Sequence, residues 1–212
     1  MQYSGIEEIT NFLKKLDTEG EFSDALSDEK RWQELLKSEN KTVMETLGYL
    51  SEFGELKQVT DKINDFIKQA SENSVTYQQV REPIQKLAKV EIEEMLAIYA
   101  IGESLFFKGE FEKAASISSF LSCLNPNISS FWRMTGFCYK KLGNQNAALP
   151  FFLYASMVNS LEIENHLASI GCLNQLGFSQ EALNYYNSAK EVLSEAERWD
   201  DIKILDSSIA AA

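Results

Sequence analysis

The fold of this 212-residue chain is decided by residues 131–158, which read FWRMTGFCYKKLGNQNAALPFFLYASMV. Apolar side chains recur at helical spacing over residues 131–142, and Gly143 then supplies a break where a positive φ is tolerated. A second helix is predicted from about residue 146 to 158. Gly136 on the first helix has no side chain to hold the second helix away. The stretch therefore predicts a tightly packed helical hairpin.

The same features recur with a period of 34 residues on both sides of this hairpin. Glycines fall at Gly109, Gly143 and Gly177, and an alanine follows each glycine five residues later. Self-similarity at such a period is typical of proteins built from stacked helical hairpins. The second copy resembles the tetratricopeptide repeat, whose framework positions are occupied by Trp132, Gly136, Tyr139, Gly143, Ala148, Phe152 and Ala155.

We therefore predict an all-α protein, a tetratricopeptide-repeat α-solenoid of three helical hairpins with a C-terminal capping helix. The repeats are placed at about 95–128, 129–162 and 163–196. The capping helix carries one apolar face, formed by Trp199, Ile202, Leu205 and Ile209. Residues 1–90 lack the period and are predicted as a separate helical region, with helices at about 4–16, 28–37, 41–54, 56–72 and 76–94. The domains are then 1–90 and 91–212.

Composition and charge exclude several classes of partner. The net charge of −12 disfavours binding to nucleic acid and to anionic membrane surfaces. The amino terminus carries acids where a secretion signal carries bases, and no apolar run is long enough to span a bilayer, so we expect a cytoplasmic protein without membrane insertion. The three cysteines form no Cys-x-x-Cys pair and are predicted to be small, reduced packing residues.

The residues that enzymes need are sparse in this chain. His166 is the single histidine and takes the position of the repeat's tryptophan, so it is predicted to be a packing residue and not a base. Neither a metal-ligand cluster nor a phosphate-binding glycine motif is visible. The sequence therefore predicts a protein without catalytic residues, metal or cofactor.

The first helix of each hairpin lines the inner face of this repeat, and its outward positions are the candidate peptide-binding residues. Those that we single out are Leu96, Tyr99, Glu103, Phe106, Phe107, Arg133, Phe137, Lys140, Lys141 and Leu167. Together they predict an apolar trough with a basic edge, which suits an extended segment with apolar anchors. Each aromatic residue in this set also fits a position in the core. The basic clamp with which some of these repeats hold acidic chain ends is missing, because its positions hold Tyr99, Glu103 and Ala168.

Residues 91–212 resemble the class II chaperones of bacterial type III secretion, which hold pore-forming translocator proteins. The resemblance rests on three repeats, a terminal helix and two runs that follow the family's pattern without gaps, FLSCLNP at 120–126 and SFWRMTGFC at 130–138. It implies a non-catalytic chaperone in the bacterial cytoplasm. Such a chaperone binds a secreted, hydrophobic translocator or effector in its groove, delivers this client to components of the export apparatus, and in some cases forms a homodimer.

Two departures from the family pattern leave an alternative open. About 90 residues precede the first repeat here, where the family has a short helical arm, and Glu103 stands where the family tends to have an apolar groove residue. The alternative is a scaffold or adaptor subunit of a secretion or other assembly, which would dock through residues 1–90.

Overall fold

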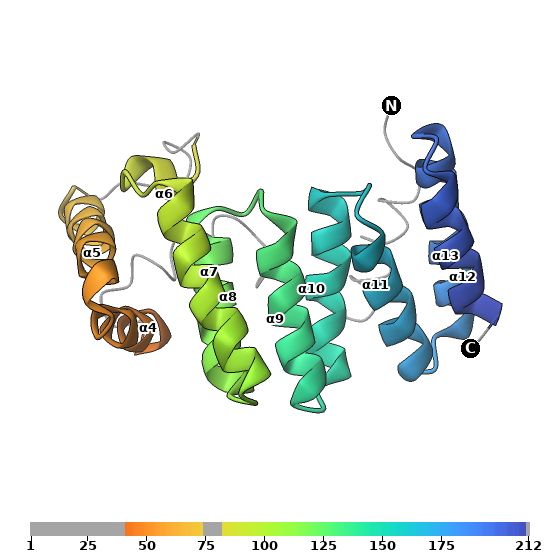
Figure 1. Cartoon of the computed structure of the whole chain (residues 1–212), viewed down its shortest axis with the longest axis horizontal. Coiled ribbons are helices and arrows are strands. Elements are labelled where there is room, and N and C mark those ends of the chain that lie inside the picture. The colour runs from red at the N-terminus through yellow and green to blue at the C-terminus, as the bar shows by residue number, and fades with distance from the viewer. Residues whose placement is uncertain (1–40, 74–81, 211–212) are drawn as a thin grey trace. The chain divides into compact units, whose positions relative to one another are not determined.

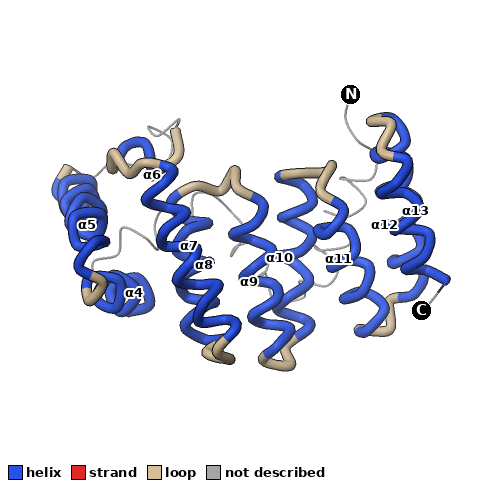
Figure 2. Tube along the Cα trace, viewed as in Figure 1, coloured by secondary structure: helices blue, strands red, loops and turns tan. Residues whose placement is uncertain are grey.

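The computed structural model describes residues 41–73 and 82–210, and these residues form helices joined by turns and loops, without a strand (Figure 1). They belong to two compact units, one of residues 41–73 and 82–127 and the other of residues 128–210. Figure 2 shows that short loops join most consecutive helices. The all-α prediction is confirmed for this part of the chain, and the helices predicted at about 4–16 and 28–37 lie outside it.

The first unit combines a repeat-like hairpin with helices that precede it. The hairpin is α7 (Ile92–Phe107) and α8 (Phe111–Leu124), and α4 packs against α8. An ion pair between Lys62 and Glu94 joins α5 to α7 at 2.8 Å. The preceding helices are α4 (Lys41–Ser51), the 3₁₀ turn η1 (Gly54–Leu56), α5 (Lys57–Glu72) and α6 (Ile84–Leu87).

The prediction of one helix over 76–94 is wrong, because the chain turns between α6 and α7. Lys89 adopts a left-handed conformation with φ of 54°, and Glu91 caps the new helix with Glu94, whose carboxylate accepts the Glu91 N–H at 2.8 Å. The buried Gln85 amide donates to the Val90 carbonyl and accepts from Asn125 at the end of α8. These bonds satisfy the polar groups that the break exposes.

The second unit contains two hairpins and a terminal helix. Each helix packs on the next along the chain, and Ala148, Phe152, Leu173, Tyr185 and Leu193 are among the buried residues of their common core. The helices are α9 (Ser129–Lys141), α10 (Gln145–Val158), α11 (Ile163–Gln175), α12 (Ser179–Glu195) and α13 (Trp199–Ala210).

The three hairpins close with the same turn. Gly109, Gly143 and Gly177 have φ of 82°, 79° and 81°. Each glycine N–H donates to the carbonyl three residues earlier, at 3.0 or 3.1 Å, and the following N–H reaches the carbonyl five residues before it at 2.9 Å. This pair of bonds satisfies carbonyls that the helix end would leave open, and it needs the left-handed conformation that glycine tolerates best. The 34-residue period of the sequence is therefore the period of this turn.

Close helix contact within the second hairpin depends on Gly136. A Cβ built on Gly136 would lie 2.6 Å from Cε1 and 2.7 Å from Cδ1 of Phe152, whose side chain is fully buried. Ala148 is buried on the same partner helix. The close approach predicted for this pair of helices is therefore confirmed.

The terminal helix caps the second unit through part of its predicted face. Ile202 and Leu205 are buried, and α13 packs on α12 and α11. Trp199 is 57% exposed, so the prediction that it joins this packing is wrong. Trp199 is the first residue of the helix and lies directly after the turn at Glu197, which positions it at the edge of the packed face.

Candidate functional site

Helix α7 of the first unit carries half of the candidate peptide-binding residues, here called the α7 stripe: Leu96, Tyr99, Glu103, Phe106 and Phe107. At 3.6 residues per turn, these side chains leave the helix within an arc of about 100°. Leu96 is 51% exposed and Phe107 is 85% exposed, while the other three are half-buried. The stripe therefore presents a largely apolar surface along one side of α7.

Two neighbouring phenylalanines of the α7 stripe lie in different surroundings. The Phe106 ring meets Phe111 of α8 edge to face, with 5.3 Å between ring centroids, and it meets Phe107 at 5.9 Å. Phe106 thus helps to pack the hairpin. Phe107 is the most exposed of the large apolar side chains described, which leaves nearly a whole aromatic ring in contact with water.

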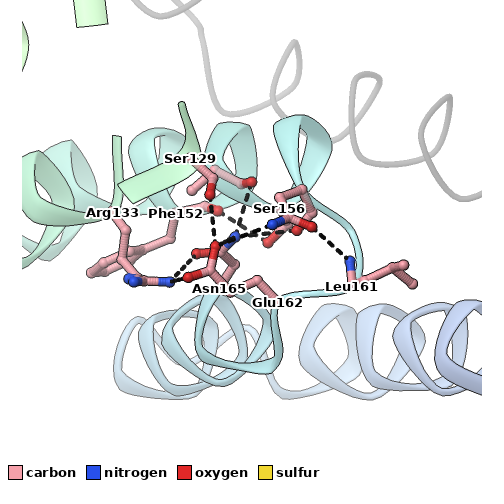
Figure 3. Close-up of polar contacts among 9 residues, drawn as sticks. Ser129, Arg133, Phe152, Ser156, Leu161, Glu162 and Asn165 are labelled. Atoms are coloured by element: carbon pink, nitrogen blue, oxygen red, sulfur yellow. Dashed lines mark hydrogen bonds and ion pairs between the residues drawn. The ribbon is translucent and has the colours of Figure 1, made fainter. Parts of the chain in front are cut away.

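Arg133 of the second unit is held by partners within that unit (Figure 3). Its guanidinium forms an ion pair with Glu162 and donates to the Asn165 side-chain oxygen at 3.0 Å. Glu162 precedes α11 and Asn165 lies in its first turn, so these contacts join α9 to the start of the third hairpin. The predicted basic edge therefore includes one cation whose charge is already paired.

Further hydrogen bonds fix both partners of Arg133. Ser129 donates to the Glu162 carboxylate at 2.6 Å, and the Asn165 amide donates to the carbonyl oxygens of Ala155 at 3.0 Å and Asn159 at 3.2 Å. Burial alone would raise the pKa of Glu162, but the hydrogen bonds from Ser129 and Arg133 outweigh it and hold this pKa below its ordinary value. We name these four residues, Ser129, Arg133, Glu162 and Asn165, the hairpin joint.

Sequence reasoning identified Arg133 but missed Glu162 and Asn165. The ion pair joins residues 29 positions apart, which is shorter than the 34-residue period and matches no local helical spacing. An arginine on the predicted inner face would have been the signal to search for an acid in the following hairpin, because charges that lose contact with water are usually paired.

The other candidates of the second unit line α9 and α11. Phe137 and Leu167 are half-buried and pack against the core, and the Phe137 ring lies edge to face with Phe152 at 5.1 Å. Lys140 acts on the buried Cys172 thiol electrostatically, which places its ammonium near α11. Lys141 is exposed. A Cβ on Gly171 of α11 would meet open space, so this face has room beside the helix backbone.

His166 is buried and both of its ring nitrogens have partners. Nε2 lies 2.8 Å from the Ser160 carbonyl oxygen, which can only accept, so Nε2 carries the proton. Nδ1 then accepts from the Tyr185 hydroxyl at 3.0 Å. Burial lowers the pKa of His166 and favours the neutral ring. The prediction that this histidine is a packing residue is confirmed.

The buried thiols are likewise unreactive. Burial raises the pKa of Cys138 to about 12 and that of Cys172 to about 11, and only the thiolate is a good nucleophile or metal ligand. Among residues 41–73 and 82–210, no three His, Cys, Asp or Glu side chains are grouped so as to hold a metal ion. Within the same ranges, the helices lack the combination of length and apolar character that crossing a bilayer requires.

The chain is similar in fold to solved chaperone structures. The type III secretion translocator chaperone SycD of Yersinia enterocolitica aligns with a TM-score of 0.55 and 20% identity, over 63% of this chain and 100% of that chain. SycD in complex with a peptide of the translocator YopD aligns with a TM-score of 0.50 and 20% identity, over 57% and 94%. PcrH of Pseudomonas aeruginosa, in complex with the chaperone-binding region of PopB, aligns with a TM-score of 0.50 and 19% identity, over 56% and 97%.

No protein-family model matches the chain, and no curated protein matches it by sequence. The structural likeness nevertheless confirms the predicted fold, the tetratricopeptide-like fold that the translocator chaperones SycD and PcrH share. At this level of identity the likeness concerns the fold.

Proposed function

We propose that this protein is a non-catalytic type III secretion chaperone. It binds an extended segment of a hydrophobic, translocator-like client and keeps that client soluble in the bacterial cytoplasm until export. The α7 stripe is the proposed client surface of the first unit, and Arg133, Phe137, Lys140, Lys141 and Leu167 are the candidate contacts of the second unit.

The observation that carries the proposal is the exposed apolar surface of the α7 stripe. A helix that packs by one face normally turns polar residues to the solvent. On α7, Leu96 and Phe107 face outward and expose most of their side chains. The half-buried rings of Tyr99 and Phe106 lie between them on the same side of the helix, and an apolar helix side that no packing explains is a candidate binding surface. The solved complexes of SycD with a YopD peptide and of PcrH with a segment of PopB agree with a chain segment as the ligand.

The energy for binding comes from burying these side chains. Covering one large apolar side chain that is now exposed contributes about 1.5–3 kcal/mol, so Phe107 and Leu96 supply the main anchors. Lys140 and Lys141 can donate to client carbonyl or carboxylate oxygens. Arg133 contributes chiefly by holding α9 against the third hairpin, because its charge is paired there with Glu162.

Affinity capture from the native cytosol tests the proposal. The tagged full chain is compared with a Leu96→Glu/Phe107→Glu variant, and Ile204→Glu serves as control because Ile204 is 49% exposed on α13, far along the chain from α7. Phe106 and Phe137 are left unchanged because both pack against other rings. Circular dichroism verifies that each variant is folded.

We expect a secreted protein with membrane-active segments to be captured by the wild type and the control. The affinity of the double variant for this client should fall at least about tenfold, which is equivalent to about 1.4 kcal/mol of binding free energy. Capture of export-apparatus components that persists unchanged in the double variant would overturn the chaperone proposal and favour the scaffold alternative.

A further inference from the structure

Glu103 lies at the centre of the α7 stripe. Tyr99 precedes it by four residues and Phe107 follows it by four, so one aromatic neighbour lies on each side along the same face of the helix. Glu103 itself is half-buried. Its carboxylate places a negative charge between aromatic side chains, and a nearby cation or hydrogen-bond donor would compensate this charge.

No described residue of its own unit provides that compensation. Among residues 41–73 and 82–127, no side chain forms a salt bridge or hydrogen bond with the Glu103 carboxylate, while Lys62 is paired with Glu94 and Lys113 with Glu110. Lys108 follows Glu103 by five residues, which places it about 140° further around the helix. Within the described part of this unit, the stripe therefore presents a negative charge that no cation pairs with.

We propose that the client segment carries a lysine or arginine with an apolar residue on each side, and that its cation pairs with Glu103. This inference rests on the proposed function, since it takes the α7 stripe as the client surface. The charge of the whole chain, −12, also attracts a basic segment. The ligand is thus a basic-apolar peptide, in contrast to the acidic chain ends that other tetratricopeptide repeats clamp.

The helix geometry sets the spacing in this peptide. Four residues of α-helix span about 6 Å, from Tyr99 to Glu103 and again from Glu103 to Phe107. An extended chain advances about 3.3 Å per residue, so about two residues cover the same distance. A segment that runs along α7 therefore matches the stripe when it has the order apolar, any residue, basic, any residue, apolar.

Fluorescence anisotropy with short labelled peptides tests this inference. Three peptides carry leucines at the two apolar positions and differ only in a central Lys, Gln or Glu. Each is titrated with wild type, Glu103→Gln, Glu103→Lys and a Leu96→Gln/Phe107→Gln double variant, which removes the apolar side chains without adding charge. Because Glu103 is half-buried, thermal unfolding checks that its substitutions leave the fold intact.

The wild type should bind the Lys-centred peptide about fivefold more tightly than the Glu-centred one, the ratio expected for one half-exposed ion pair. Glu103→Gln should remove most of this preference, and Glu103→Lys should reverse it. Equal binding of all three peptides that is lost in Leu96→Gln/Phe107→Gln would overturn the basic preference and leave the α7 stripe as the client surface. Binding that the double variant does not weaken, or no saturable binding below about 1 mM, would overturn the assignment of the stripe as well.

Discussion

Replacing Gly136 with alanine tests whether close helix contact determines the second hairpin. The new Cβ would lie 2.6, 2.7 and 3.0 Å from three atoms of the Phe152 ring. That ring cannot swing away like the end of a flexible side chain, because it is fully buried and packs edge to face on Phe137. The α9 or α10 backbone must therefore shift to admit one methyl group.

The expected change in the free energy of unfolding follows from two opposing effects. Overpacking a well-packed core costs about 1–3 kcal/mol, and a contact with three ring atoms belongs in the upper part of that range. Alanine in place of glycine within a helix contributes about 1 kcal/mol in the opposite direction. We therefore expect Gly136→Ala to lower the free energy of unfolding by about 1–2 kcal/mol.

Two other glycines provide matched controls. Gly171 is also inside a helix, but an added Cβ there meets nothing within 4 Å, so Gly171→Ala should stabilise by up to about 1 kcal/mol. Gly102 is intermediate, because its Cβ would lie 3.2 Å from Cγ2 of Ile117. In stability, Gly171→Ala should rank above Gly102→Ala, and Gly102→Ala above Gly136→Ala.

Urea and thermal unfolding followed by circular dichroism measure these differences. A change of 1 kcal/mol shifts Tm by about 2–4 °C in a chain of this size, which is readily resolved. Adding Phe152→Leu to Gly136→Ala should recover part of the loss, because the two sites are coupled through one contact. If Gly136→Ala stabilises the protein as much as Gly171→Ala does, close approach is not the reason for glycine at position 136.

Four further outcomes follow from the structure. Glu197 holds a left-handed conformation with φ of 57°, so Glu197→Gly should stabilise the protein by about 0.5–1 kcal/mol in thermal unfolding; a lower Tm would contradict this. The folded-state pKa of Glu162 lies below its ordinary 4.5. The stabilisation that the ionised Glu162 carboxylate gives the folded protein is therefore present above pH 4.5 and is lost as the pH falls through the lower value. Urea unfolding of Glu162→Gln should therefore show reduced stability at neutral pH and a weaker decline in acid. His166 is the single histidine, so its NMR titration can be followed without assignment, and it should titrate below 6.5; a pKa at or above 6.5 would refute its buried, neutral state. Thiol labelling under native conditions should spare Cys138 and Cys172, which should react only on unfolding.

The hairpins were predictable because their determinants are local. A left-handed turn every 34 residues selects glycine at Gly109, Gly143 and Gly177, and the helices between these turns carry apolar residues at helical spacing. The turn between α6 and α7 uses the same backbone geometry but holds Lys89. Lysine gives no sign of a positive φ, so a continuous helix was predicted there.

The candidate site was predictable only as a set of outward positions. Helical periodicity places Leu96 and Phe107 on the exposed side of α7, where they lie. It does not show that Phe106 packs on Phe111, because that contact depends on how α8 returns along α7. The pairing of Arg133 with Glu162 depends likewise on the packing of successive hairpins, a long-range property that no local pattern contains.

The hairpin joint also breaks the interchangeability that repeat proteins usually have. Moved one period toward the C-terminus, the positions of Arg133, Glu162 and Asn165 hold Leu167, Ala196 and Trp199. One period toward the N-terminus they hold Tyr99, Ile128 and Phe131. The residues at the equivalent positions of the other repeats cannot form these hydrogen bonds. The network is therefore specific to the junction of the second and third hairpins, and it fixes the order of these two hairpins. A new repeat inserted between α10 and α11 would leave the half-buried guanidinium of Arg133 without its partners, and growth of this protein by duplication is therefore penalised at this junction.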